Sequence, residues 1–314
     1  MSIAVTPSVV TMPQQHPGYR LVLDFLAQRF PNIPRQVWLQ RMQEGKVHWD
    51  DGRLIDAQTV YVPQQRVCYY REVAEEPVIP FAETILYQDE ELLVACKPHF
   101  LPVTPGGIYV QECLLNRLRR RTGIDTLVPL HRIDRETAGI VLFSVNPAHR
   151  GRYHQLFSDG RIRKLYHAVA PVVNVDDRAA ETAVRVGQRW LVENRMVKGE
   201  PGFRMQTTAG AVNARSTVEC VALNGARGLF HLNPLTGKTH QLRVHMCGLG
   251  MPLENDRFYP LLHPQSADNY QQPLQLLAKQ VEFTDPVTGQ QRFFQSERVL
   301  QWPAGAPQDA PAER

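Results

Sequence analysis

One nine-residue segment, 131–139, places a carboxylate among cations. Its sequence is HRIDRETAG, so Asp134 stands between Arg132 and Arg135. Positive charges close to a carboxylate favour its ionised form, and Asp134 should therefore carry its charge at neutral pH. An ionised carboxylate can act as a nucleophile or as a general base, which makes Asp134 a candidate catalytic group. The competing interpretation is a salt-bridged turn with no catalytic role, and the charge pattern alone favours that interpretation.

Two apolar runs must position this segment. Leu127 to Leu130 and Ile140 to Val145 are rich in Val, Leu, Ile and Phe, a composition typical of buried strands. The charged residues therefore occupy a loop between two strands. Gly139 permits the tight turn that closes the loop, because glycine adopts backbone angles that other residues avoid.

Several stretches, in order along the chain, resemble the motifs of RNA pseudouridine synthases of the RluA type. HRIDRETAG resembles the HRLDxxTSG signature of that family. Residues 93–98, LVACKP, resemble the strand and Lys-Pro turn that open its catalytic domain. Residues 164–168, KLYHA, and 237–245, GKTHQLRVH, resemble two later motifs. The similarity runs from near Ile85 to near Trp302.

Two positions and one segment depart from the family pattern. Ala138 stands where the family usually has Ser, and Ile133 where it usually has Leu. Residues 255–260, NDRFYP, differ from a GDxxYG-like turn. The last change affects the expected shape of that loop and leaves the chemistry intact.

The resemblance implies an isomerisation in which the bond between uracil and ribose is cut and carbon 5 of the turned base bonds to the same ribose carbon. No group enters or leaves, so the resemblance implies no cofactor and no metal. The chain also lacks a P-loop and a Rossmann glycine pattern, the motifs of nucleotide cofactor sites.

The resemblance also implies roles for four residues. Asp134 would attack the sugar or remove a ribose proton, and the sequence does not choose between these routes. Arg243 would be its bidentate counter-ion, with a charge on a helix surface as the alternative. Tyr166 would stack on the flipped uracil with its hydroxyl near carbon 5, although a tyrosine in a strand is more often core. Leu242 would line the same pocket or belong to the core.

Substrate binding is expected from Arg132 and His131 at the start of the segment. A base inside RNA structure must be extruded to reach Asp134, and the resemblance implies that Arg132 would fill the gap left by that base, with a phosphate contact or a salt bridge as the alternative. His240 and His245 are five residues apart, which does not place them on one helix face, and no nearby acid completes a metal site. We interpret these two histidines as structural polar groups near the pocket.

Two other functions compete with an RNA isomerase. One is an RNA-binding protein whose catalytic domain only docks, which the presence of Asp134, Tyr166 and Arg243 disfavours. The other is a hydrolase that uses Asp134 on a different glycosidic substrate. A hydrolase needs a second acid, and Glu136 is the neighbouring carboxylate in the segment.

Positive charge is concentrated around the segment, although the net charge of the 314 residues is only +4. Residues 117–164 contain 11 Lys and Arg against 4 Asp and Glu, an excess of +7, which leaves −3 for the rest. Such a concentration suits a phosphate backbone. The alternative is a solvated helix end, where 119–121 would complement the helix dipole. The expected partner is structured RNA, either ribosomal or transfer RNA.

Composition predicts a cytoplasmic protein without a membrane segment, and we expect a monomer. No apolar run reaches membrane-spanning length, and the N-terminus has no basic region followed by an apolar core. An odd number of cysteines without a C-x-x-C pair argues against disulfides and zinc. These cysteines are Cys68, Cys96, Cys113, Cys220 and Cys247.

The predicted fold class is α+β, with a mixed, mostly antiparallel sheet, flanking helices and a small N-terminal α/β domain. Residues 33–49, IPRQVWLQRMQEGKVHW, resemble the core of the alpha-L RNA-binding domain of many pseudouridine synthases, and a structural cap is the alternative. The predicted order is a flexible arm (1–18), the alpha-L-like domain (19–76), a linker (77–84), the catalytic domain (85–302) and a disordered tail (303–314).

Local patterns predict individual elements. Helices are expected over Leu21 to Phe30, from Pro34 to Gly45, and over Tyr109 to Thr122. Residues Trp190 to Ala211 mix charge, Gly and Met, and are expected to be an exposed excursion without regular pairing. Leu165 to Val173 is expected to be a strand.

Overall fold

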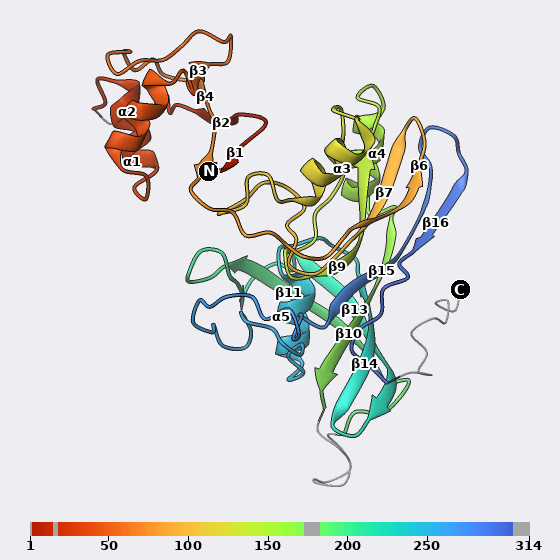
Figure 1. Ribbon diagram of the computed structural model, residues 1–314. Helices are drawn as coiled ribbons and strands as arrows, with labels where there is room; N and C mark the ends of the chain where they lie inside the picture. Colours follow the sequence, from red (N-terminus) through yellow and green to blue (C-terminus); the bar gives the residue numbers. More distant parts are fainter. Residues whose placement is uncertain (1, 15–17, 173–182, 304–314) are drawn as a thin grey trace. The chain divides into compact units, whose positions relative to one another are not determined.

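The computed structural model describes residues 2–14, 18–172 and 183–303, which divide into two compact units (Figure 1). The N-terminal unit comprises residues 1–78 and 105–112, and the large unit comprises 79–104 and 113–314. The predicted tail beyond residue 303 lies outside the described residues.

The N-terminal unit combines two helices with two small sheets. Its elements are β1 (Ser2–Ile3), β2 (Ser8–Thr11), α1 (Val22–Arg29), α2 (Arg35–Gln43), β3 (Val47–Trp49), β4 (Arg66–Tyr69) and β5 (Glu72–Val73). Strands β2, β4 and β3 form one sheet in that order, and β1 pairs with β5. Phe25 and Leu26 of α1 and Trp38 of α2 are buried in a core of their own. The first two predicted helices are therefore confirmed.

The structure differs from the flexible arm expected over 1–18. Val9 in β2 pairs with Cys68 in β4, and Met12 is only 1% exposed. The partner strand lies more than fifty residues further along the chain, so local composition carries little signal for this pairing. Met1 and residues 15–17 lie outside the described residues.

The large unit is built on an 11-stranded sheet with three helices in its described residues. The strands are β6 (Thr84–Gln88), β7 (Leu92–Lys97), β8 (Val128–Pro129), β9 (Ala138–Ser144), β10 (Arg163–Pro171), β11 (Arg189–Lys198), β12 (Met205–Thr208), β13 (Ala214–Asn224), β14 (Arg227–Pro234), β15 (Leu276–Thr284) and β16 (Gln291–Gln295), and the helices are α3 (Leu114–Thr122), α4 (Arg150–Ser158) and α5 (Gln241–Gly248). The order is β12-β11-β13-β14-β10-β15-β9-β7-β6, with β16 beside β15 and β8 beside β9.

The described strands of this sheet pair antiparallel, except β9 and β15, which pair in parallel. The predicted α+β class with a mostly antiparallel sheet is therefore confirmed. Helix α5 contacts β12, β13 and β14, and Leu242 and Met246 of α5 join a core with Ala168 of β10 and Phe230 of β14. The expected strand over Leu165 to Val173 corresponds to β10, and Val173 itself lies outside the described residues.

Two predicted segments take a different form. The helix expected over Tyr109 to Thr122 begins only at Leu114, because the backbone N–H groups of residues 110–112 donate to Oε1 of Glu76 at 2.6–2.8 Å. The excursion expected over Trp190 to Ala211 is wrong, since β11 and β12 form a hairpin on β13. Most residues of this hairpin are exposed or half-buried, so the apolar alternation that marks a strand is weak.

Gly139 allows β9 to approach β15 closely. Its φ is +115°, and a Cβ atom built there would lie 2.2 Å from the carbonyl oxygen of Ala278. Ala278 is the residue that pairs with Gly139 in the parallel ladder. Glycine is therefore required here by contact between strands as well as by its backbone angle.

His167, which is buried, stacks on the half-buried His231 across β10 and β14. Their ring centroids are 4.5 Å apart and the planes differ by 13°. His167 is 0% exposed, and neither of its ring nitrogens has a hydrogen-bond partner among the described residues. Burial, with smaller contributions from His231 and Lys279, lowers the pKa of His167 to about 3. The folded protein therefore holds this histidine neutral.

The first prediction concerns the close approach at Gly139. We expect Gly139→Ala to lower the free energy of unfolding by at least about 2 kcal/mol, because the methyl group meets backbone and the residue must keep a strained φ. Urea unfolding measures this change. Gly151→Ala in α4 is the control, since a Cβ there meets nothing within 4 Å, and this variant should be neutral or slightly more stable. Equal effects of the two substitutions would contradict the prediction.

The second prediction concerns the pH dependence of stability. The pKa of His167 is depressed in the folded state. The contribution of neutral His167 to the free energy of unfolding is therefore complete above about pH 6.5, and it is lost as the pH falls from there toward 3. The loss is at most about 1.4 kcal/mol per pH unit. We expect His167→Phe to unfold with a shallower dependence on pH between 7 and 5, because the unfolded chain gains one proton fewer.

The control for this experiment is His154→Gln, which replaces an exposed histidine of α4. Its urea midpoint should change with pH as the wild-type midpoint does. An unchanged pH dependence in His167→Phe would show that protonation of His167 does not limit stability in acid.

Candidate active site

The loop between β8 and β9 brings Asp134 to helix α5. Nη1 of Arg243 donates to Oδ2 of Asp134 at 3.4 Å. Arg243 is 1% exposed, whereas the Asp134 side chain keeps 25% of its surface exposed. The predicted contact between these residues is present, and the alternative of a surface charge for Arg243 is wrong. Asp134 can therefore meet a molecule from solvent while it contacts a buried cation.

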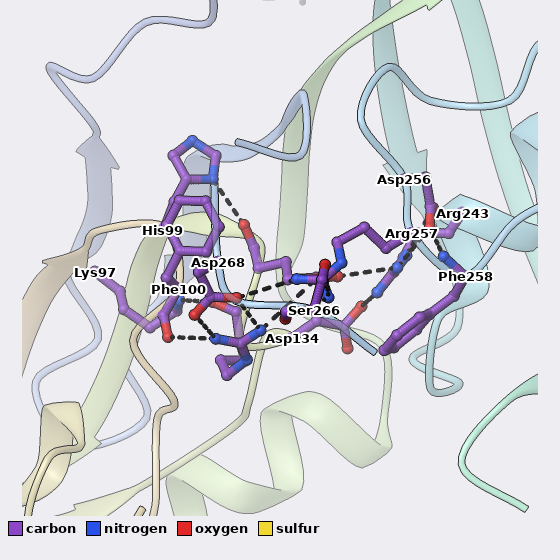
Figure 2. Close-up of polar contacts among 12 residues, drawn as sticks. Lys97, His99, Phe100, Asp134, Arg243, Asp256, Arg257, Phe258, Ser266 and Asp268 are labelled. Atoms are coloured by element: carbon purple, nitrogen blue, oxygen red, sulfur yellow. Dashed lines mark hydrogen bonds and ion pairs between the residues drawn. The ribbon is translucent and has the colours of Figure 1, made fainter. Parts of the chain in front are cut away.

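The bidentate partner of Arg243 is Asp256 and not Asp134 (Figure 2). Nε donates to Oδ2 of Asp256 at 2.8 Å, and Nη2 donates to Oδ1 at 2.6 Å. Nη2 also donates to Oε2 of Glu136 at 3.2 Å. The predicted bidentate pair with Asp134 is therefore wrong, because the fork of the guanidinium fits one carboxylate and Asp256 occupies it.

Three carboxylates surround this one guanidinium. Burial opposes the charge of Arg243, but the hydrogen bonds to Asp256 and the charges of Asp134 and Glu136 outweigh it and raise the pKa of Arg243. Burial raises the pKa of Glu136, and the charge of Arg243 opposes that shift. Arg243 therefore remains a cation at neutral pH and holds the three carboxylates close to one another.

Lys97, at the end of β7, holds the backbone of the loop that contains Asp134. The side chain is fully buried, and Nζ donates to the carbonyl oxygens of Pro98 at 2.9 Å and Arg135 at 3.0 Å. Burial lowers the pKa of Lys97, while the charge of Asp134 opposes this shift. The Lys-Pro turn seen in the sequence thus fixes the backbone one residue after Asp134.

Neither of the two arginines that flank Asp134 in the sequence pairs with its carboxylate. Arg135 forms a bidentate pair with Asp268, at 2.6 and 2.9 Å. Arg132 is exposed, and its guanidinium forms no hydrogen bond or ion pair with the described residues. The cation that contacts Asp134 is therefore Arg243, which is distant in sequence. Arg132 is available to a ligand.

His240 lies on the other side of the Asp134 carboxylate. Its Nε2 is 4.0 Å from Oδ1 of Asp134, and its Nδ1 is 2.9 Å from the hydroxyl oxygen of Tyr259. Burial lowers the pKa of His240, although the charge of Asp134 opposes the shift. The predicted location of His240 near the pocket agrees with these contacts. His245 is fully buried, with Nε2 3.2 Å from Oδ1 of Asn194.

Tyr166 and Leu242 lie together beside Asp134 and Arg243. Tyr166 is half-buried and packs against the apolar core that contains Leu242, which is 7% exposed. Burial, reinforced by the charge of Asp134, raises the pKa of Tyr166. Its hydroxyl is therefore protonated at neutral pH. The structure brings Asp134, Tyr166, Leu242 and Arg243 into one region.

His131 packs against neighbouring elements. Its Nε2 accepts a hydrogen bond from the backbone N–H of Leu142 at 3.1 Å, and its ring stacks on Phe157 with centroids 4.9 Å apart. Burial, with a smaller contribution from Lys164, lowers the pKa of His131 to about 3. These contacts give His131 a role in holding the loop, and substrate binding by His131 stays a prediction.

The divergent turn 255–260 supplies Asp256. Asn255 has a φ of +62°, and asparagine is one of the few residues besides glycine that tolerates this left-handed angle. Oδ1 of Asp256 accepts hydrogen bonds from the backbone N–H groups of Phe258 at 2.8 Å and Tyr259 at 3.1 Å. The Asp of the GDxxYG-like pattern was the signal that could have identified Asp256 from the sequence.

In residues 2–14, 18–172 and 183–303, no cluster of three or more His, Cys, Asp or Glu side chains could hold a metal ion. No helix in those ranges is long and apolar enough to cross a membrane.

Known proteins provide an independent comparison. Residues 91–247 match the family described as RNA pseudouridylate synthase. An uncharacterized RNA pseudouridine synthase of Synechocystis sp. is 28% identical over 76% of this chain and 79% of that protein. The dual-specificity RNA pseudouridine synthase RluA of Haemophilus influenzae is 31% identical over 69% of this chain and 94% of its own length.

The fold is also similar to that of a solved human protein, RNA pseudouridylate synthase domain containing 1. The TM-score is 0.54 at 19% identity, and the match covers 71% of this chain and 86% of that one. This likeness concerns the fold, while the family match and the relative from Haemophilus influenzae establish the kinship. The chain therefore belongs to the RNA pseudouridylate synthase family, whose members are isomerases that convert uridine to pseudouridine in RNA.

Proposed function

We propose that Asp134 is the catalytic residue with which this chain isomerises uridines in structured RNA. The observation that carries the proposal is the position of Asp134, which is one-quarter exposed and contacts the buried cation Arg243. Tyr166 lies close enough for the charge of Asp134 to affect its hydroxyl. The site therefore combines a reachable carboxylate, a fixed cation and an aromatic ring.

The overall reaction exchanges one bond of ribose carbon 1 for another. The bond to uracil nitrogen 1 breaks and a bond to carbon 5 forms, while carbon 5 loses a proton and nitrogen 1 gains one. Asp134 starts this sequence by attacking the sugar or by removing a ribose proton, and both routes need its ionised form. The direct contact with Arg243 stabilises that charge.

Tyr166 is proposed to stack on the turned base and to act on a proton near carbon 5. Because its pKa is raised, the hydroxyl is protonated at neutral pH and is a weak base. It can receive the proton of carbon 5 only as it passes its own proton on, and the nearby Asp134 carboxylate is the natural acceptor. Leu242 supplies an apolar contact in the same region.

Asp256 is proposed to position Arg243 rather than to touch the substrate. It holds two nitrogens of the guanidinium and leaves Nη1 for Asp134. Glu136, on the catalytic loop, contacts Nη2 and ties the loop to α5. A hydrolase that used Glu136 as its second acid would have to take this side chain from Arg243.

The proposed substrate is ribosomal RNA, with transfer RNA as the second candidate. The +7 excess over residues 117–164 and the exposed Arg132 support binding to phosphates and to an extruded base. Residues 1–78 contain 8 Lys and Arg and 8 Asp and Glu, so the large unit supplies the net attraction. RNA binding by the N-terminal unit is proposed from its alpha-L resemblance, and a monomeric cytoplasmic state stays a prediction.

The third prediction tests the catalytic role of Asp134. We expect Asp134→Asn to lower pseudouridine formation by at least about 100-fold, because the amide keeps the size but loses the charge and the basicity. The assay measures pseudouridine in total RNA from a strain that lacks this protein, after incubation with each variant under single-turnover conditions. Ribosomal and transfer RNA are separated afterwards to identify the substrate class.

Asp125→Asn is the control for this assay, since Asp125 is an exposed carboxylate of the same basic segment. It should retain wild-type turnover, and both variants should unfold at the wild-type temperature. Substantial turnover by a folded Asp134→Asn variant would refute the catalytic assignment. Absence of pseudouridine with the wild-type protein would refute the proposed function as a whole.

The fourth prediction tests Asp256 as the residue that positions Arg243. We expect Asp256→Asn to lower kcat by roughly 10-fold or more with little change in KM, because the guanidinium is no longer held by two charged contacts. Glu254→Gln is the matched control. Glu254 lies two residues before Asp256 and pairs bidentately with Arg227, at 2.6 and 2.7 Å. Equal loss of kcat in both variants would indicate general damage to the loop.

A further inference from the structure

We propose that Phe203 and Phe258 form a stacking site for an unpaired nucleobase beside the target uridine. The proposal rests on the proposed function, since it takes the ligand to be RNA. Phe203 lies in the turn of the β11–β12 hairpin, outside the stretches that resemble family motifs. Phe258 belongs to the turn that holds Asp256.

The first observation is the exposure of Phe203. The residue is 52% exposed, although burying a phenylalanine ring stabilises a folded protein. Its ring contacts Phe258, with centroids 5.3 Å apart and planes inclined by 53°. One part of the ring is therefore fixed against the protein, and the remainder is open to solvent.

The second observation is the continuity of planar groups from Phe203 to the catalytic carboxylate. The ring of Phe258 lies under the guanidinium of Arg243 at 4.7 Å and beside the ring of His240 at 5.5 Å. Figure 2 shows Phe258 next to Arg243 on the side of the site where Asp256 lies. Phe258 and Arg243 thus connect Phe203 to Asp134 through direct contacts, so a base on Phe203 would bind beside the site proposed for the uridine.

The third observation is that the hairpin is anchored to the same turn. The backbone N–H of Met205 donates to the hydroxyl oxygen of Tyr259 at 2.7 Å. Arg204 donates to the carbonyl oxygen of Pro260 at 3.1 Å and lies over the ring of Tyr259 at 5.0 Å. Phe203 therefore stands on a fixed support, which reduces the entropy lost when a base binds.

Charge near the rings favours a nucleotide as the occupant. Lys198 at the end of β11 and Lys238 before α5 are exposed, and Arg204 is partly exposed. Glu200 is the exposed carboxylate of the hairpin tip. Lys198 pairs with Met205 across the hairpin, and Arg204 follows Phe203 in the chain. An aromatic ring on an element that also carries cations matches the stacking platforms that bind single-stranded RNA, where each base contributes about 1–3 kcal/mol. An aliphatic protein partner would not use these cations.

The test uses a binding probe that requires no knowledge of the target uridine. A labelled 12-residue oligouridylate and an abasic ribose-phosphate oligomer of the same length present the same backbone with and without bases. Fluorescence anisotropy measures the Kd of each for the full-length protein. We expect Phe203→Ala to weaken oligouridylate binding by roughly 5- to 150-fold and to leave abasic binding unchanged. Phe203→Trp should restore the preference for bases.

Leu191→Ala is the matched control, because Leu191 is 61% exposed on the same hairpin. It should bind both oligomers like the wild type. Equal affinities of wild type and Phe203→Ala for oligouridylate would overturn the proposal. An equal loss for both oligomers would also overturn it, since that result indicates a structural role for Phe203.

Turnover on total RNA separates this proposal from the proposed function. A wild-type protein that forms pseudouridine but shows no base preference dependent on Phe203 would leave the function standing and remove the stacking site. A base preference that depends on Phe203 without any turnover would support the stacking site and refute the proposed function.

Discussion

The site depends on one buried guanidinium that is shared by three carboxylates. Arg243 is 1% exposed, and its nitrogens contact Asp134, Glu136 and Asp256. A charge buried without partners costs several kcal/mol, so α5 can bury Arg243 only if the loop that holds Asp134 and Glu136 and the turn at Asp256 supply their carboxylates. The same ion cluster thus assembles three separate segments. Their relative positions, and with them the geometry at Asp134, follow from the neutralisation of a single cation.

The sequence was sufficient for the parts of the site that recur as motifs. The loop with Asp134 and the strand with Tyr166 were predicted from local patterns of residues, and Arg243 was identified because residues 237–245 resemble a family motif. The sequence could not rank the partners of Arg243, since the choice between Asp134 and Asp256 depends on the orientation of the guanidinium in the fold. It also made Arg132 and Arg135 look like the counter-ions of Asp134, because neighbours in sequence need not face one another.

The elements that the sequence did not predict pair with strands far along the chain, are largely exposed, or are held by a single side chain. Strand β2 needs β4 as a partner, and its four residues carry little information alone. Few residues of the β11–β12 hairpin are buried, so its sequence does not show the alternation of apolar and polar residues that marks a half-buried strand. Residues 110–112 fit a helical pattern, yet Glu76 binds their N–H groups outside a helix. Tertiary contacts decided each of these cases, whereas α1 and α2 follow from local periodicity.

The unequal sharing of Arg243 suits the proposed chemistry. A carboxylate in a bidentate pair loses both oxygens to the guanidinium, and it would have to break two strong hydrogen bonds before it could reach a ribose carbon or proton. Asp256 takes that constrained position and is buried, so it can do no chemistry on a substrate. Asp134 keeps one contact at 3.4 Å, which supports its negative charge and leaves Oδ1 facing His240 at 4.0 Å. The strong pair therefore fixes the cation, and the weak contact leaves the nucleophile or base free to move toward the sugar.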